Sequence, residues 1–373
     1  MKFCNCRLDE LQDRIKGQKL ILFGIGEYWE LYVKEALSEE VLRSVSYVID
    51  NHSFNSEVQI LNNRVPIYHP SKLLEEDDCF LLLSSGMYIY EMYEQLASMD
   101  LCDDIRCYAF PLIMANSVGK SDIQIKEYIK KTRNHPQIEK VIHCFWFSGD
   151  KKPEAYQKCI DSWVKICPDY EIREWNVDNY DYTVNKFMQQ AIEQRKWAFA
   201  SDYARLDVIY RQGGIYMDMD VELLHSLDSL LGNEAFFTFD TQNDIDLGTF
   251  AAKQGNPLIK KIMALYDDIE FSDDVKTMNK LCQPRYIRSV LKDAGVRLNG
   301  NLQLLDGMVF LPRNYLAPLD SVLYEPTAMS DETLAMHHFN AGWRDDAYRE
   351  KRIANNRKLW KLIEDDDWER TGD

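Results

Sequence analysis

The stretch that most constrains this 373-residue chain is 200–222, ASDYARLDVIYRQGGIYMDMDVE. Its first half predicts a helix with an apolar side, and Asp202 and Arg205 share a face of that helix because they are three residues apart. Gly213 and Gly214 are expected to end the helix, since glycine tolerates the left-handed conformation of a C-terminal cap. The stretch therefore predicts a helix, a diglycine turn and a following strand.

The strand expected over 215–217 ends in two acids, Asp218 and Asp220. Strand side chains alternate between faces, so we expect both carboxylates to point the same way. Two neighbouring carboxylates repel, and a divalent cation removes that repulsion. Oxygen ligands suit Mg²⁺ or Mn²⁺, which keep positions open for substrate phosphates. An Asp-x-Asp alone is more often a solvated strand end, but the acids combined with Asp202, Arg205 and the diglycine indicate a metal–diphosphate site.

The whole segment resembles the DXD-containing sugar transferases, family 32 of the glycosyltransferases. The family pattern is met by Ser201, Asp202, Arg205, Gly213, Gly214, Ile215, Tyr216, Asp218 and Asp220. This family includes yeast-type initiating mannosyltransferases and bacterial capsule and O-antigen enzymes, and the clostridial glucosylating toxins resemble it more distantly. The resemblance covers residues 140–345 and is strongest over 198–222.

The resemblance implies a fold and an activity. The expected fold of 138–345 is α/β, a GT-A-type nucleotide-diphospho-sugar transferase domain built around a mixed, mostly parallel sheet. The implied enzyme is a retaining hexosyltransferase with Mn²⁺ or Mg²⁺ as cofactor. It would move a sugar from a nucleotide-sugar donor, a UDP-sugar first and GDP-mannose second, to a glycan or lipid-linked acceptor hydroxyl. Surface polysaccharide biosynthesis, such as capsular polysaccharide, is the expected setting.

The resemblance also implies roles for the central residues. Asp220 is the expected direct metal ligand, and Asp218 contacts the donor ribose or the metal through water. Asp202 and Arg205 hold sugar hydroxyls, which is catalysis by positioning. Tyr216, which also matches the family pattern, is a further residue expected to bind the donor.

Two aromatic residues are candidates for the nucleotide's base and ribose. The strand expected over 140–147 lies where the family has its first strand, although the proline of its usual start is absent here. Phe145 and Trp146 match the positions at which the family lines the base, and an aromatic ring can stack on a nucleobase. Without the resemblance, a core role for Trp146 is equally favoured.

The last landmark is 336–343, MHHFNAGW, which has the spacing of the family's His-His and Trp block. His338 is the preferred metal-side ligand and His337 the alternate. Trp343 would reach the donor diphosphate through its indole N–H. Gly342 replaces the serine that often precedes that tryptophan. A lone His-His pair would more often be structural, but its pairing with the Asp-x-Asp favours a ligand.

One usual contact of the family is missing. Relatives often carry an asparagine about nine residues before the equivalent of 256–257, and here that position is Leu247. Asp244 or Asp246 could substitute for it. We expect acceptor specificity to be set here and in 271–300, which the sequence does not decode.

The first 111 residues predict a small Rossmann-like domain. Apolar strands alternate with helices there, which implies parallel βαβ units; the strands are expected at 19–23, 45–49, 79–83 and 106–110, with a short edge segment at 65–67. The glycine-rich turn 24–26 resembles a phosphate-binding loop, but Glu27 follows it and Trp29 replaces the third glycine. A structural or partner-binding role is preferred over dinucleotide binding.

The remaining segments complete the expected division into 1–111, 112–137, 138–345 and 346–373. Residues 112–137 predict a linker with a basic helix over 123–131. This helix could touch a membrane surface, although a solvated linker helix is favoured. Residues 346–373 predict a charged helix and tail.

Bulk properties exclude several classes. The net charge of −17 argues against a nucleic-acid binder. The start of the chain is polar and resembles no signal peptide, and no apolar run approaches the roughly 20 residues of a spanning helix. The nine cysteines show no zinc-site spacing, so a reduced cytoplasmic setting, including the inner face of the cell membrane, is expected. The oligomeric state stays open.

Two other classes of function compete with the transferase. A haloacid-dehalogenase-type phosphohydrolase would use Asp218 and Asp220, followed by Val221, as its nucleophile motif. That motif normally follows a buried strand at the start of a domain, which is not its position here. The second competitor is a non-catalytic nucleotide-sensing protein built on the first domain, against which the intact acid pair argues.

Overall fold

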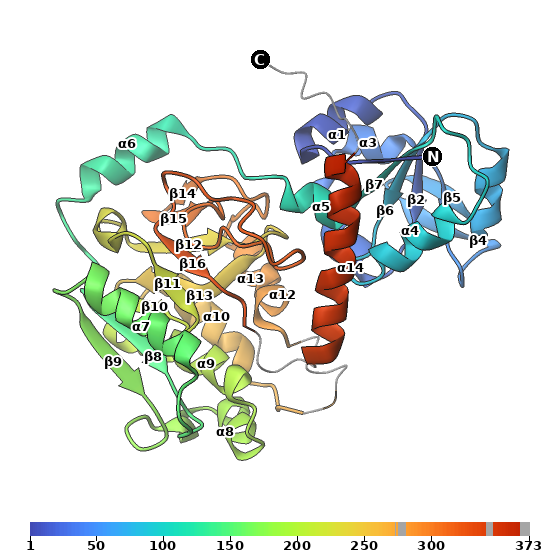
Figure 1. Ribbon diagram of the computed structural model, residues 1–373. Helices are drawn as coiled ribbons and strands as arrows, with labels where there is room; N and C mark the ends of the chain where they lie inside the picture. Colours follow the sequence, from blue (N-terminus) through green and yellow to red (C-terminus); the bar gives the residue numbers. More distant parts are fainter. Residues whose placement is uncertain (273, 275–280, 341–345, 366–373) are drawn as a thin grey trace. The chain divides into compact units, whose positions relative to one another are not determined.

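The computed structural model describes residues 1–272, 274, 281–340 and 346–365. The chain divides into two compact units, each with its own sheet and core (Figure 1). Unit 1 contains 1–117, 321–325 and helix α14 (Asp346–Asp365), and unit 2 contains the described residues of 118–320 and 326–344. Residues 112–117 and α14 thus fall within unit 1 in this division.

Unit 1 is built on a seven-stranded sheet with the order β1-β7-β6-β2-β3-β5-β4. Its strands are β1 (Lys2–Cys4), β2 (Leu20–Phe23), β3 (Val45–Ile49), β4 (Ser56–Ile60), β5 (Asn63–Tyr68), β6 (Phe80–Leu83) and β7 (Arg106–Ala109). All neighbours pair in parallel except the β4–β5 hairpin at one edge. The four principal strands expected from the sequence are confirmed, whereas β1 and β4 were not foreseen.

The unit 1 sheet is buried on both faces, as its continuous apolar strands require. Leu20 and Leu22 of β2 join the core that α1 covers, while Ile21 and Phe23 join the core on the other face with α4. The helices of this unit are α1 (Leu8–Ile15), α2 (Lys34–Ala36), α3 (Glu39–Arg43), α4 (Ile89–Ala97), α5 (Phe110–Ala115) and α14. The parallel α/β character of this region is confirmed, and its dinucleotide binding stays a disfavoured prediction.

The sequence predicts a helix from the glycine turn of unit 1 to about Leu42, but in the structure this segment is broken. A π-helical turn, Trp29–Val33, leads into α2, and Leu37 is extended with ψ 138°. Ser38 then caps α3 by accepting a hydrogen bond from the Val41 N–H. The local preference of serine for an N-cap therefore interrupts a helix that periodicity alone would continue.

Unit 2 has a seven-stranded mixed sheet with the order β14-β15-β12-β13-β10-β8-β9. Its strands are β8 (Val141–Phe145), β9 (Glu171–Trp175), β10 (Gly214–Met217), β12 (Ala235–Phe239), β13 (Ile245–Ala252), β14 (Gln303–Leu305) and β15 (Met308–Leu311). β9, β8 and β10 are parallel, as are β12 and β15, while β13 runs antiparallel between β10 and β12 and β14 pairs antiparallel with β15. Unit 2 therefore has the mixed α/β architecture expected of a GT-A-type domain.

Helices cover both faces of the unit 2 sheet (Figure 1). They are α6 (Ile123–Thr132), α7 (Glu154–Ile166), α8 (Lys186–Glu193), α9 (Trp197–Gln212), α10 (Pro257–Met263), α12 (Gln283–Tyr286) and α13 (Arg288–Asp293). Tyr216 of β10 joins the core on the α9 face, and Ile215 and Met217 join the core on the α7 face. None of the helices in the described part of the chain combines the length and apolar composition needed to span a bilayer.

The sequence also predicts that 223–228 continues the main sheet and that 187–199 is helical, and both predictions are wrong in detail. The segment 223–228 does not extend the main sheet; instead β11 (Val221–Leu223) pairs with β16 (Ala335–His337) in a separate two-stranded sheet. The helix expected over 187–199 is two helices, because Arg195 adopts a left-handed φ of 55° between α8 and α9. Both differences arise where the chain turns, and the spacing of apolar residues along the sequence does not reveal such turns.

The diglycine after α9 depends on conformation and space together. Gly213 and Gly214 have φ of 71° and 96°, and the Gly213 N–H caps α9 by donating to the Ile209 carbonyl at 2.8 Å. A Cβ on Gly214 would lie 2.8 Å from the Val141 carbonyl oxygen and 3.1 Å from His143 Nε2. Glycine is therefore needed at 214 for both reasons.

We expect Gly214→Ala to lower the free energy of unfolding by about 2–5 kcal/mol, the sum of left-handed strain and overpacking. Gly255→Ala is the matched control, since Gly255 has φ 77° but nothing within 4 Å of its Cβ position. The control should lose only about 1–2 kcal/mol. Urea denaturation measures both losses. Equal losses would show that the close contact between position 214 and β8 adds nothing to the destabilisation.

Candidate active site

Arg205 is the centre of a buried polar cluster on α9. Its Nη2 lies 3.3 Å from Asp202 Oδ1 and donates to Ser201 Oγ at 2.9 Å. Its Nη1 lies 3.3 Å from Asp218 Oδ2 and donates to the Leu247 carbonyl at 2.9 Å. The helix face predicted for Asp202 and Arg205 is thus confirmed, and the guanidinium links that face to the end of β10.

Burial sets the charge state of this cluster. It raises the pKa of Asp202 to about 7, although the Arg205 guanidinium opposes the rise. Burial likewise raises the pKa of Asp218, and the Arg205 guanidinium again opposes the rise.

Contacts with Tyr216 and Arg205 fix the position of Asp218. The Tyr216 hydroxyl donates to Asp218 Oδ1, and the Arg205 guanidinium carbon lies 4.7 Å from the Tyr216 ring centroid. The cluster therefore holds Asp218 in one position.

Asp218 and Asp220 occupy the turn after β10, and both face one histidine. His337 Nε2 lies 3.4 Å from Asp220 Oδ1 and 3.9 Å from Asp218 Oδ2. Burial alone would raise the pKa of Asp220, but the charge and hydrogen bond of His337 and the N–H of Asn340 lower it to about 2. The antiparallel register of β11 and β16 sets Val221 opposite His337 and so delivers the ring to the acids.

The structure brings His337, the alternate of the two candidate histidines, to the acid pair. His338 Nε2 instead lies 3.1 Å from Glu222 Oε2, while the His338 N–H donates to the Asp220 carbonyl. Neighbouring residues of an extended chain point to opposite faces, so only one histidine can face the acids. Trp343 and Gly342 lie outside the described residues.

The three side chains fit a divalent cation. One ligand atom from each of Asp218, Asp220 and His337 lies within 4.8 Å of the others. Adjacent ligands of an octahedral ion with bonds of 2.0–2.1 Å stand about 3 Å apart, so small side-chain movements suffice. Two carboxylates and one imidazole suit Mn²⁺ and accommodate Mg²⁺.

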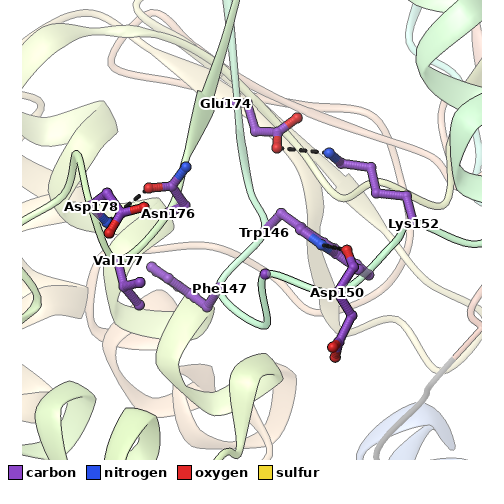
Figure 2. Close-up of a pocket in the computed structure, with 9 residues that line it drawn as sticks. Trp146, Phe147, Asp150, Lys152, Glu174, Asn176, Val177 and Asp178 are labelled. Carbon is purple, nitrogen blue, oxygen red and sulfur yellow. Dashed lines mark hydrogen bonds and ion pairs between the residues drawn. The ribbon is translucent and has the colours of Figure 1, made fainter.

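A pocket of about 250 Å³ opens at the carboxyl ends of β8 and β9. Its lining includes Trp146, Phe147, Asp150, Lys152, Glu174, Asn176, Val177 and Asp178 (Figure 2). Trp146 is held by its indole N–H, which donates to the Asp150 carbonyl at 2.7 Å, and Lys152 pairs with Glu174 at 2.7 Å. The pocket thus has one fixed aromatic wall and a polar rim.

The other aromatic candidate, Phe145, does not line this pocket. Its side chain is buried in the core and packs against Tyr180 and Tyr216, with ring centroids 5.2 and 6.2 Å away. Alternation along β8 and the residue after it sends Phe145 and Trp146 to opposite sides. Only Trp146 of this pair is placed to meet a ligand in the pocket.

The acids considered as substitutes for the missing asparagine have other partners. Asp244 forms a buried ion pair with Arg288, and Asp246 Oδ2 lies 2.7 Å from His337 Nδ1. At the position of the asparagine itself, Leu247 contributes its carbonyl to Arg205. The link between Asp246 and His337 was not foreseen, because it joins residues 91 apart in sequence.

Residues 153–237 match the family described as "glycosyltransferase sugar-binding region containing DXD motif". This match confirms the resemblance drawn from the residues between Ser201 and Asp220.

Among curated proteins, the chain is similar to two inositol phosphoceramide mannosyltransferases of Schizosaccharomyces pombe. Mannosyltransferase 3 is 25% identical over 134 residues, which cover 34% of this chain and 36% of the relative. Mannosyltransferase 2 is 31% identical over 167 residues, which cover 41% and 47%. The aligned region spans less than half the length of either relative.

Two solved structures are also similar. The PaToxG glycosyltransferase is 20% identical, with 48% of this chain and 86% of that chain covered and a TM-score of 0.31. A glycosyltransferase involved in the glycosylation of the major capsid of PBCV-1 is 11% identical, with 57% and 98% covered and a TM-score of 0.32.

Proposed function

We propose that unit 2 is a metal-dependent glycosyltransferase that moves a sugar from a nucleotide-sugar donor to an acceptor hydroxyl. The observation that carries this proposal is the convergence of Asp218, Asp220 and His337 beside the Asp202–Arg205 pair. The family match over 153–237 supports it. Retention of the anomeric configuration, a UDP-sugar or GDP-mannose donor, and a glycan or lipid-linked acceptor in surface polysaccharide synthesis are the finer parts of the proposal.

Each residue has a role in this mechanism. Asp218, Asp220 and His337 would hold Mn²⁺ or Mg²⁺, with His337 now preferred over His338. When bound, the cation offsets the charge that develops on the leaving diphosphate. Asp202 accepts hydrogen bonds from sugar hydroxyls, and Arg205 fixes Asp202 and Asp218 in the geometry for reaction.

The proposal includes a route for retention. The carboxylates beside Arg205 are engaged, because Asp218 accepts from Arg205 and Tyr216 and Asp202 pairs with Arg205. We therefore favour attack of the acceptor on the face of the departing diphosphate, with a leaving-group oxygen taking the acceptor proton. Isolation of a covalent sugar–enzyme adduct would contradict this route.

We assign the pocket at Trp146 to the donor's base and expect Trp146→Ala to weaken donor binding. Loss of one base–aromatic stack of about 1–3 kcal/mol corresponds to about 5- to 150-fold in the dissociation constant. Trp146→Phe keeps an aromatic face and should retain most of the affinity. Isothermal titration calorimetry with the donor measures both, and equal weakening by the two variants would contradict stacking.

A donor screen tests the proposed function. Thermal shift and slow hydrolysis are measured for UDP-, GDP-, CMP- and dTDP-sugars, with Mn²⁺ and with EDTA. The proposal predicts that one donor stabilises and is hydrolysed only with the metal. Binding of none of them, together with turnover of a phosphomonoester through a phosphorylated Asp218, would instead support the phosphohydrolase. Tight dinucleotide binding without transfer or hydrolysis would support the nucleotide-sensing protein.

A further inference from the structure

Asp246, near the start of β13, has one hydrogen-bond partner at each of its two carboxylate oxygens. Its Oδ2 lies 2.7 Å from His337 Nδ1, and its Oδ1 accepts the Gly248 N–H at 2.9 Å. Only 8% of the Asp246 side chain is exposed. The carboxylate therefore cannot turn without breaking a buried hydrogen bond, and it presents one fixed oxygen to the histidine.

The opposite edge of the same imidazole faces the acid pair. His337 Nε2 points at Asp220 and Asp218, while Nδ1 points at Asp246. A carboxylate can only accept, so the nitrogen facing Asp246 carries the hydrogen. A cation would take the place of the proton that Nε2 shares with Asp220 and would use the Nε2 lone pair, because Nδ1 donates to Asp246. This arrangement fixes both the orientation and the proton position of the ring.

Gly248 supplies the space for that orientation. A Cβ at Gly248 would lie 2.4 Å from His337 Cε1, 2.6 Å from His337 Nδ1 and 3.1 Å from Asp218 Oδ2. Its φ lies outside the left-handed region, so a side chain is excluded by space and not by conformation. Its carbonyl also accepts the Asp218 N–H at 2.7 Å. Gly248 thus contacts both the histidine and the acid that surround the proposed cation.

We propose that Asp246 and Gly248 are positioning residues for the cation site. Asp246 holds the His337 imidazole with Nε2 toward the acids, and Gly248 leaves the room that the ring needs. Neither residue is a ligand itself. This inference rests on the proposed function, because it assumes that Asp218, Asp220 and His337 bind a divalent cation.

The first test is Asp246→Asn, which keeps the shape of the side chain. The asparagine can still accept the Gly248 N–H, but its amide group then faces His337 Nδ1 as a donor. The favoured tautomer would carry its hydrogen on Nε2, pointing into the cation site. We expect Mn²⁺ affinity, measured by electron paramagnetic resonance without donor, to fall about 10- to 100-fold.

The preference between two metals separates positioning from general damage. An imidazole ligand favours Mn²⁺, whereas oxygen ligands suit Mg²⁺. Asp246→Asn perturbs the imidazole of His337 but leaves the oxygen ligands of Asp218 and Asp220 in place. Mg²⁺ affinity, measured by competition against Mn²⁺, should therefore fall less than Mn²⁺ affinity. Gly248→Ala should shift the same ratio in the same direction, because the ring is displaced while Asp246 remains.

Asp244→Asn is the matched control. It removes the charge of Asp244, two residues before Asp246, and so weakens the buried ion pair between Asp244 and Arg288. The variant should be less stable, but the Mn²⁺ affinity of the folded protein should stay within about twofold of wild type. If folded Asp246→Asn binds Mn²⁺ as tightly as wild type, the inference is wrong and the proposed function stands. A wild type that binds no Mn²⁺ contradicts the proposed function, and the inference with it.

A second readout keeps the test decisive if a variant is unstable. In the wild type, the Nδ1–H of His337 should give a far-downfield, slowly exchanging proton resonance, because it is buried against a carboxylate. His337→Gln, which removes the ring, assigns the signal. Asp246→Asn should abolish it, whereas Asp244→Asn should retain it. Absence of the signal from the folded wild type would overturn the proposed role of Asp246.

Discussion

Asp220→Asn is expected to lower kcat/KM for metal-dependent donor turnover by at least about 100-fold. Asp220 carries the most strongly ionised carboxylate of the cluster, since its pKa is lowered to about 2. The asparagine is neutral. Its NH₂ group would take the place either of the oxygen that faces His337 or of the oxygen that accepts the Asn340 N–H, where two donors would then meet. Loss of this charge weakens the hold on the cation and on the departing diphosphate.

Glu222→Gln is the control for the Asp220 variant. It also removes one negative charge, two residues further along, from a carboxylate that pairs with His338 rather than with His337. Donor hydrolysis should stay within about threefold of wild type, because exposed ion pairs contribute little. If Asp220→Asn kept more than a tenth of the wild-type rate, or if the control fell as far, the assignment of Asp220 as a ligand would fail.

The largest expected loss of stability comes from Arg205→Met. Removing one partner of a buried charge network typically costs about 3–5 kcal/mol, because the remaining charges are left without compensation. In Arg205→Met, the carboxylates of Asp202 and Asp218 and the carbonyl of Leu247 would remain buried without the guanidinium that they contact in the wild type. Turnover should be lost as well, since both acids lose the group that positions them. Urea denaturation and donor hydrolysis measure the two effects.

The loss caused by Arg205→Met should grow with pH. Asp202 already has a pKa of about 7, against 3.8 for an unperturbed aspartate. The folded protein therefore binds more protons than the unfolded chain between these values, and stability falls as pH rises there. Without Arg205 the pKa of Asp202 and that of Asp218 rise further, which extends this fall above pH 7. The difference from wild type should therefore be larger at pH 8 than at pH 5.

Arg173→Met controls for the loss of an arginine at an exposed pair. Arg173 and Glu171 are 38% and 56% exposed, and their pair should contribute at most about 1 kcal/mol at either pH. An Arg205→Met protein as stable as this control at pH 8 would show that the buried cluster is not held together by the guanidinium.

The central helix, turn and strand were predictable because their signals are local. The three-residue spacing of Asp202 and Arg205, the glycines at 213–214 and the apolar run of β10 act within one or two turns of the chain. The same holds for β2, β3 and β6 of unit 1, each in a short, mostly apolar run bounded by polar residues or glycine.

The choice between His337 and His338 could not be made from the sequence. It depends on the register of β16 against β11, whose residues are more than a hundred positions apart. The role of Asp246 is equally non-local, since β13 must run antiparallel beside β10 to bring it to His337. In contrast, strand alternation alone could have separated Phe145 from Trp146, because adjacent residues face opposite sides.

The most direct test of this account is a calorimetric titration of Mn²⁺ into the wild-type protein, with and without the nucleoside diphosphate of the donor. We predict a single Mn²⁺ site per chain, which binds the ion more tightly when the diphosphate is present and which Asp220→Asn removes. Binding of the diphosphate with equal affinity in EDTA, and no saturable Mn²⁺ site, would contradict the cation site at Asp218, Asp220 and His337.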